Sequence, residues 1–139
     1  MSKFKTILIL IVVITLNAIA IQTVLASEKS QVVVITSDCC STCQKLKPVI
    51  EDLKYSYEWQ IDFVVVNLSS RASLEEAKQI AEERGFTQFL EEHKATLPTV
   101  GILCPGGKVE KVFIGETRKE VYTQALDELL LDSSKLCSL

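Results

Sequence analysis

Alternating strand-like and helix-like patterns run along the chain and limit the folds that it can adopt. The run Val32–Ile35 is apolar on both faces, as in a strand that is buried in a parallel sheet. A helical pattern follows, with Leu46, Ile50 and Leu53 on one face, and a second apolar strand is predicted from Ile61 to Leu68. A strand, a helix and a second strand in this order imply a crossover between parallel strands.

The middle of the chain predicts two helices. Ser73-Leu74-Glu75-Glu76 has the spacing of a capping box, so a helix is predicted to begin there. Gly85 can adopt the left-handed conformation that ends a helix. The segment Phe86–Lys94 predicts a second, short helix with Phe89 and Leu90 facing inward.

The last third predicts a hairpin and a helix. Thr99–Cys104 and Lys108–Ile114 have strand patterns, and the Pro-Gly-Gly between them favours a tight turn. Thr117-Arg118-Lys119-Glu120 is a second capping pattern that is predicted to open a helix facing the sheet with Val121, Ala125, Leu126 and Leu129. The whole order predicts a single α/β domain in which helices flank both faces of a central mixed sheet of about four strands.

The N-terminal segment has the features of an export signal. Lys3 and Lys5 precede an uncharged run, and 16 of the 20 residues from 7 to 26 are apolar. Val24-Leu25-Ala26 offers a cleavage site, but about 20 apolar residues could also stay in the membrane as an anchor. We expect residues 1–26 to be a signal peptide or membrane anchor, and residues 27–139 to be a domain outside the cytoplasm, periplasmic, secreted or membrane-anchored, where disulfides persist.

The charge balance excludes some classes of partner. Beyond residue 26 the chain has 13 basic and 18 acidic residues, so it has no basic surface suited to nucleic acid or anionic lipid. The chain has only three Pro and five Gly, which argues against a disordered or fibrous protein.

Cys40 and Cys43 are the candidate catalytic residues. They lie three apart, where the first strand is predicted to pass into the first helix. A helix N-terminus has free N–H groups and a partial positive charge, which favour a thiolate over a thiol. Cys40 would be the nucleophile, and Cys43, nearly one turn later, could attack the mixed disulfide that Cys40 forms. Such a pair supports thiol–disulfide exchange without a metal or organic cofactor.

Over residues 31–131 the chain resembles the thioredoxin superfamily, near its minimal, glutaredoxin-sized form. The Cys40-Ser-Thr-Cys43 motif follows the first buried strand, and Pro48 stands where thioredoxins have a helix-kinking proline. Leu97-Pro98-Thr99 is similar to the family's cis-proline segment, and Gly115 matches the glycine before the last helix. The resemblance implies an oxidoreductase that acts on protein disulfides with the help of a redox partner protein. It also implies that Leu97 and Pro98 bind an extended substrate segment.

The chain also departs from the thioredoxin pattern. Val34 stands where thioredoxins bury an aspartate, and Val65 or Val66 replaces the lysine that partners it. Cys39 replaces a tryptophan, and the strand and helix that precede the redox strand in thioredoxin have no counterpart between residues 26 and 31. The direction of the reaction, its potential and its physiological substrate therefore stay open.

Cys39, Cys43 and His93 offer an alternative function. The spacing Cys39-x-x-x-Cys43 with a distant histidine resembles the motif of Sco-like copper assembly factors, and soft thiolates with one imidazole suit copper. The alternative is therefore a copper-binding, metallochaperone-like protein. Zinc binding by Cys40 and Cys43 would need two further ligands, and no second cysteine pair supplies them. A third hypothesis is a binding module whose cysteines are purely structural.

Three further features have two interpretations each. Cys104 and Cys137 could form a disulfide that fastens the last helix to the hairpin, or they could be unrelated thiols. Asn67-Leu68-Ser69 matches the N-glycosylation pattern, which also occurs by chance. The apolar residues 7–26 could associate with a membrane or be removed with a signal peptide.

Overall fold

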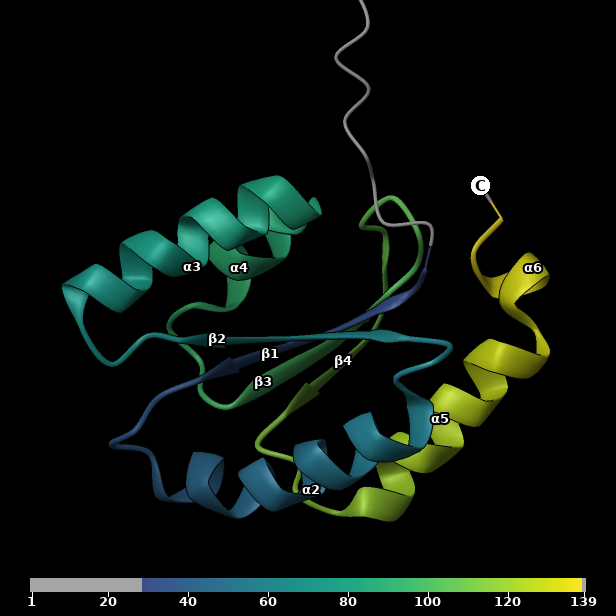
Figure 1. Ribbon diagram of the computed structural model, residues 1–139, viewed down its shortest axis with the longest axis horizontal. Coiled ribbons are helices and arrows are strands. Elements are labelled where there is room, and N and C mark those ends of the chain that lie inside the picture. The colour runs from purple at the N-terminus through teal and green to yellow at the C-terminus, as the bar shows by residue number, and fades with distance from the viewer. Residues whose placement is uncertain (1–28, 139) are drawn as a thin grey trace, which may run out of the picture.

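A four-stranded sheet with the strand order β2-β1-β3-β4 forms the centre of the structure (Figure 1). The computed structural model describes residues 29–138, so the expectations for residues 1–26 lie outside the described residues. The elements along the chain are β1 (Gln31–Thr36), α2 (Ser41–Tyr57), β2 (Asp62–Asn67), α3 (Arg71–Arg84), α4 (Thr87–His93), β3 (Thr99–Leu103), β4 (Val109–Ile114), α5 (Lys119–Leu131) and α6 (Ser133–Leu136).

The strand register brings the ends of three strands to one edge of the sheet. β1 pairs in parallel with β2, so Thr36 lies opposite Asn67 at the carboxyl ends of both strands. β1 also pairs antiparallel with β3, and Ile35 lies opposite Thr99, the first residue of β3. β3 and β4 form the expected antiparallel hairpin. The crossover and the mixed sheet predicted from the sequence are therefore confirmed.

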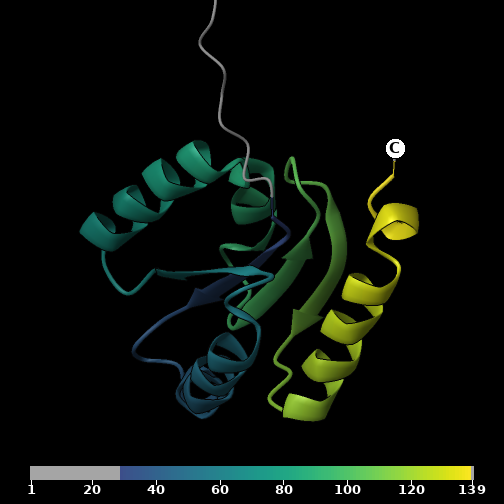
Figure 2. The same ribbon diagram turned by 45° about the vertical axis from the view of Figure 1, so that its right-hand side comes forward.

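Helices cover both faces of the sheet, as the sequence predicts (Figure 2). α2 and α5 pack on one face through a core that includes Val32, Val34, Leu46, Ile50, Leu53, Val100, Ile102, Tyr122 and Leu126. α3 and α4 pack on the other face through a core that includes Val33, Ile35, Val66, Ala77, Ala81, Phe86, Phe89 and Leu90. Burying one such aliphatic side chain stabilises a fold by about 1.5–3 kcal/mol. The run Val32–Ile35 serves both cores, which explains why its residues are apolar without alternation.

The start of α3 differs from the prediction. The helix begins at Arg71 and its N-cap is Ser70, so it starts before the predicted capping box at Ser73. The Ser70 hydroxyl oxygen accepts a hydrogen bond from the backbone N–H of Ser73 at 3.1 Å, and the Ser73 hydroxyl oxygen accepts one from the backbone N–H of Ser70 at 2.9 Å. A serine thus takes the place that a glutamate or glutamine usually has in a capping box. Gly85 ends the helix with a φ of 78°, as predicted.

The start of α5 also differs. Arg118 is the N-cap and makes no side-chain capping bond, so Thr117 does not open the helix as predicted. Instead the carboxylate of Glu116 accepts from the backbone N–H groups of Thr117 and Arg118 at 2.9 and 2.8 Å. Tyr122 takes the buried position next to the expected Val121, which is only half-buried.

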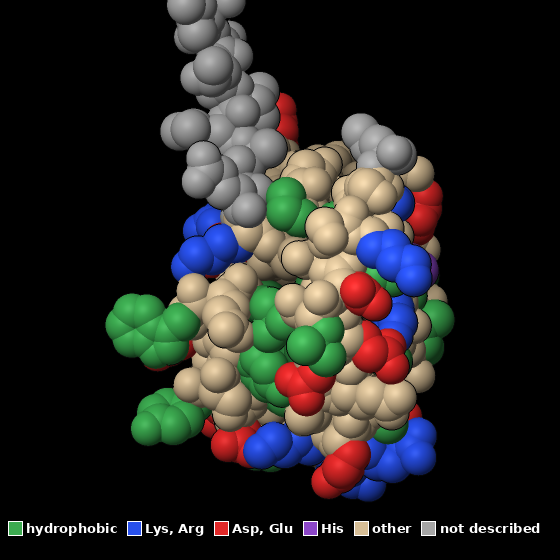
Figure 3. All heavy atoms as spheres, turned by 90° about the vertical axis from the view of Figure 1, so that its right-hand side faces the viewer, with side chains coloured by type: hydrophobic (Ala, Val, Ile, Leu, Met, Phe, Trp, Pro, Cys, Tyr) green, Lys and Arg blue, Asp and Glu red, His purple; other side chains and the backbone are tan. Residues whose placement is uncertain are grey.

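The surface that carries α5 and α6 mixes charges of both signs around an apolar area (Figure 3). Within residues 29–138 none of the helices combines the length and the apolar character needed to cross a bilayer.

Candidate active site

A disulfide between Cys40 and Cys43 lies at the N-terminus of α2, with the two Cα atoms 5.1 Å apart. Cys40 is the N-cap residue in an extended conformation (φ −96°, ψ 115°), and Cys43 lies in the first turn. Cys40 is half-buried, whereas the side chain of Cys43 is only 3% exposed. Cys40 is therefore the more exposed residue of the pair.

The Cys40 sulfur occupies the place of a helix cap. The backbone N–H of Cys43 donates to the Cys40 Sγ at 3.1 Å, as it would to a serine or aspartate oxygen in the same position. The first turn of α2 has no acidic residue to compete for the free N–H groups. The Cys40 sulfur thus lies at a helix N-terminus, where free N–H groups and a partial positive charge favour a thiolate over a thiol.

The loop before β3 reaches the same edge of the sheet. The Leu97–Pro98 peptide bond is cis, Pro98 is buried and Leu97 is half-buried. The Pro98 carbonyl accepts from the backbone N–H of Gly115 at 2.9 Å, which ties the loop to the chain after β4. Thr99 follows directly and pairs with Ile35 near the end of β1, so Leu97 and Pro98 lie at the edge from which the loop to Cys40 departs.

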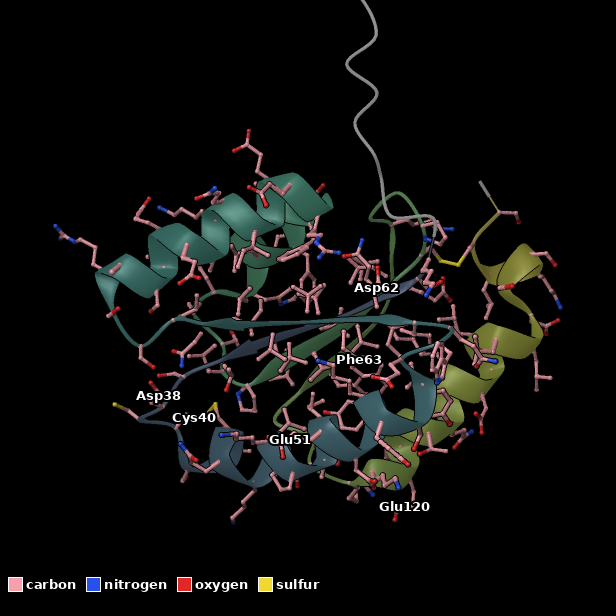
Figure 4. All side chains as sticks on the ribbon, in the orientation of Figure 1. Asp38, Cys40, Glu51, Asp62, Phe63 and Glu120 are labelled. Carbon is pink, nitrogen blue, oxygen red and sulfur yellow. A yellow bond between two sulfur atoms is a disulfide. The ribbon has the colours of Figure 1, made fainter. Side chains whose placement is uncertain are left out.

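A cleft of about 250 Å³ opens between α2 and the ends of β1 and β2, and Cys43 forms part of its wall. Its inner lining is apolar and includes Val34 and Leu46, while Asp38, Lys47 and Glu51 contribute charged groups. Glu51 lies on α2, away from the loop that carries Asp38 and Cys40 (Figure 4). The cleft gives the covered sulfur a route to water, because Cys43 is otherwise enclosed.

The three residues of the copper alternative do not form a metal site. Cys43 is bonded to Cys40, and Cys39 is an exposed free cysteine. His93 ends α4, and its ring packs against Phe89 with the ring centroids 4.8 Å apart. Among residues 29–138 there is no group of three histidine, cysteine or acidic side chains that could hold a metal ion. The structure thus contradicts the copper site, because the histidine packs on an aromatic ring rather than beside the thiols.

Cys104 and Cys137 form a second disulfide, with their Cα atoms 5.4 Å apart. Cys104 follows β3 and is completely buried, and Cys137 follows α6. Of the two interpretations of these cysteines, the bridge is the correct one. It lies at the end of β3 where Leu103 pairs with Gln31 at the start of β1, the opposite end of the sheet from Cys40.

The sequence did not predict that three polar residues contact the loop that leads to the redox pair. Asn67 and Ser69 at the end of β2 contact the loop before Cys40, and Gln44 of α2 donates to the Asp38 carbonyl at 2.9 Å. The one available signal was the parallel pairing of the first two strands, which places the ends of both strands side by side.

The comparisons with known proteins agree with this geometry. The family model for thioredoxin matches residues 12–128. No curated protein matches the chain closely enough to count as a relative. Among solved structures, the exposed lipoprotein thioredoxin Etrx1 of Streptococcus pneumoniae strain TIGR4 is similar, with a TM-score of 0.56 and 18% identity over 75% of this chain and 87% of that one.

Two further solved structures share the fold. The germline-specific thioredoxin Deadhead of Drosophila melanogaster has a TM-score of 0.54 and 15% identity over 75% of this chain and 84% of its own. DsbF of MTB, solved in mixed oxidised and reduced forms, has a TM-score of 0.55 and 21% identity over 73% of this chain and 81% of its own. Likeness at these identities shows the fold, and the family model covers most of the sequence. The chain therefore belongs to the thioredoxin family.

Proposed function

We propose that this protein is a thiol–disulfide oxidoreductase that acts on protein substrates outside the cytoplasm. The observation that carries the proposal is the Cys40–Cys43 disulfide at the N-terminus of α2 in a chain of the thioredoxin family. Cys40 is the nucleophile, because it is the more exposed of the two residues and its sulfur caps the helix. Cys43 is the resolving cysteine, because its sulfur is within bonding distance of Cys40 and covered from other thiols.

The exchange needs only the two cysteines. In the reducing direction the Cys40 thiolate attacks one sulfur of a substrate disulfide, a mixed disulfide forms and one substrate thiolate leaves. Cys43 then loses its proton to water in the adjoining cleft, and its thiolate attacks the Cys40 sulfur. The second substrate thiolate leaves, and the Cys40–Cys43 disulfide remains, which is the state in this structure. Two electrons have passed to the substrate, and the oxidising direction is the same sequence in reverse.

Leu97 and Pro98 are the proposed substrate-binding residues. Their loop lies at the same edge of the sheet as the loop to Cys40, and Leu97 is half-exposed there. An extended substrate segment that pairs with the Leu97 backbone would hold its disulfide near the Cys40 sulfur. Electrons reach or leave the redox pair through a second protein with its own thiols, and no metal or organic cofactor takes part.

An oxidising compartment is proposed on three grounds. The Cys104–Cys137 disulfide joins residues far apart in sequence, and such structural bridges persist outside the cytoplasm. The proposed division of the chain into a signal peptide or anchor at 1–26 and a working domain at 27–139 agrees with this location. One of the similar structures is described as an exposed lipoprotein.

Reduction of insulin disulfides and oxidation of a scrambled substrate test the proposed activity. The wild-type protein should catalyse at least one of the two reactions, and Cys40→Ser should reduce the rate to the uncatalysed background. Cys39→Ser is the matched control, because Cys39 is the adjacent, exposed and unbonded cysteine, and it should retain activity. Equal activity of the wild type and Cys40→Ser would contradict the role of Cys40.

A further inference from the structure

Three side chains form a closed set of hydrogen bonds beside the redox pair, which we call the Asp38 network: Asp38, Asn67 and Ser69. The Asn67 side-chain amide donates to Oδ1 of Asp38 at 2.8 Å. The Asn67 Oδ1 accepts from the Ser69 hydroxyl at 2.5 Å and from the Ser69 backbone N–H at 2.8 Å. The Ser69 Oγ accepts from the backbone N–H of Asp38 at 2.7 Å, which closes the ring.

The network fixes the loop that leads to the nucleophile. Asp38 lies two residues before Cys40 on this loop (Figure 4). Its backbone N–H is bound by Ser69, its carboxylate by Asn67, and its carbonyl by the side chain of Gln44 at 2.9 Å. The Asp38 backbone and side chain are thus tied both to the end of β2 and to the first turn of α2.

The position of the Asp38 carboxylate matters for the reduced protein. A negative charge close to the Cys40 sulfur would repel the thiolate that the exchange requires. Aspartate is also among the side chains that cap helices best, so an unrestrained Asp38 carboxylate could take the α2 N–H groups that the sulfur now uses. The Asn67 amide prevents both effects, because it holds the carboxylate oxygen at the end of β2 and donates a hydrogen bond to its charge.

We propose that Asn67 and Ser69 are positioning residues for the exchange reaction: they retain the Asp38 carboxylate at the end of β2, which leaves the N-terminus of α2 to the Cys40 sulfur. This inference rests on the proposed function in one respect, namely that Cys40 is the nucleophile. It assigns a role to the Asn67-Leu68-Ser69 segment, whose pattern had otherwise indicated only glycosylation.

The test is the pH dependence of Cys40 alkylation by iodoacetamide in the reduced full chain, with the modified residue located by peptide mass spectrometry. Asn67→Leu should raise the pH midpoint of Cys40 alkylation, and the rate at pH 7 should fall roughly threefold, the size expected for one nearby surface charge. Asp38→Ala removes both the charge and the oxygens that could cap α2, so adding Asn67→Leu in that background should leave the midpoint unchanged. The shift caused by Asn67→Leu should shrink in 1 M NaCl, where the Debye length is about 3 Å.

A second pair of variants keeps the test valid if Asn67→Leu fails to fold. Ser69→Ala removes the hydroxyl that holds both other residues, and it should shift the midpoint in the same direction as Asn67→Leu. Ser69→Thr retains the hydroxyl and should restore the wild-type midpoint. A purely structural role would lower the melting temperature of these variants without moving the midpoint.

The outcomes separate this inference from the proposed function. If Cys40 of the wild type reacts no faster than Cys39, the proposed function and the inference both fail. If Cys40 is reactive and its midpoint does not move in Asn67→Leu or in Ser69→Ala, only the inference is overturned. A shift in Asn67→Leu that persists in the Asp38→Ala background would overturn it as well, because the Asn67 amide would then act by a route other than the Asp38 carboxylate.

Discussion

Cys104, a buried residue directly after β3, is joined by a disulfide to Cys137, which directly follows α6. The disulfide therefore fastens the segment after α6 to the central sheet. The two cysteines are 33 positions apart in the sequence, and α5, which contributes Tyr122 and Leu126 to the core, lies between them. Lys108 of the hairpin adds hydrogen bonds from its ammonium group to the carbonyls of Leu136 and Ser138 at 3.3 and 3.5 Å. The bridge therefore constrains a segment that carries part of the core.

Removing this bridge should destabilise the fold. Closing a loop of this length by a disulfide is worth about 3–4 kcal/mol in the chain-entropy model, because the bridge restricts the unfolded chain. Cys137→Ala should lower the free energy of unfolding in urea by about that amount. Cys39→Ala serves as the control and should unfold like the wild type. A Cys137→Ala variant as stable as the oxidised wild type would show that the bridge contributes nothing.

The two disulfides should differ in their resistance to reduction. A thiolate must reach a sulfur to break the bond, and Cys40 is half-exposed whereas Cys104 is completely buried. In a glutathione redox titration, mass spectrometry with alkylation should find Cys40 and Cys43 reduced while Cys104 and Cys137 are still bonded. The equilibrium potential of the first pair, measured in the same titration, then assigns the direction of the reaction. Reduction of both pairs at one potential would contradict the different roles given to them.

A methyl group at position 101 should disturb the core on the α4 side. A Cβ placed on Gly101 would lie 2.7 Å from Cε2 of Phe89 and closer still to Cζ, and 2.9 Å from Cδ1 of Leu103. Overpacking of this kind costs about 1–3 kcal/mol. Gly101→Ala should therefore unfold at a lower urea concentration than the wild type. The double variant Gly101→Ala, Phe89→Leu tests the cause: it should lose less stability than the sum of the two single variants, and strict additivity would exclude a clash with the Phe89 ring.

The start of α5 should make stability depend on pH in the acidic range. Hydrogen bonds from the Arg118 side chain and from the Arg118 and Thr117 backbone lower the pKa of Glu116 to about 2. A carboxylate with a lowered pKa stabilises the folded state above its unfolded pKa near 4.5, and this contribution is lost as the pH falls toward 2.

The matching measurement compares melting temperatures of the wild type and Glu116→Gln between pH 7 and pH 2. The wild type should be the more stable above about pH 5, and the difference should shrink as the pH falls through the range between 4.5 and 2. Arg118→Gln removes the largest cause of the lowered pKa and should lose part of the same pH dependence. A difference that stays constant from pH 7 to pH 2 would contradict this account of the helix start.

The sequence predicted the elements better than it predicted their ends. Periodicity located the four strands and the helices α2 to α5, because burial against the sheet requires apolar residues at regular spacing, as at Leu46, Ile50 and Leu53. The short helix α6, which has no buried residue, was not predicted. The predicted helix starts were wrong where polar or charged side chains made hydrogen bonds that the sequence pattern did not indicate. Ser73 reaches back to Ser70 in α3, and the Glu116 carboxylate replaces the predicted cap of α5.

Only part of the candidate site could be predicted from the sequence. The Cys40–Cys43 spacing at a strand–helix junction is a local pattern, so it could be recognised without knowledge of the fold. The contacts among Asp38, Asn67 and Ser69 depend on the parallel register of β1 and β2, which no local pattern specifies. The pairing of Cys104 with Cys137 likewise depends on how α5 and α6 return toward the hairpin.

Trapping a mixed disulfide is the most direct test of the central claim, which is that Cys40 is the nucleophile. The reduced Cys43→Ser variant lacks the resolving thiol, so incubation with an oxidised model peptide should leave the peptide bonded to the Cys40 sulfur, as located by mass spectrometry under non-reducing conditions. The reduced Cys40→Ser variant should form no comparable adduct, because the Cys43 sulfur is covered. An adduct on Cys43 or Cys39 that forms as fast as the adduct on Cys40 would contradict the assignment of Cys40 as the nucleophile.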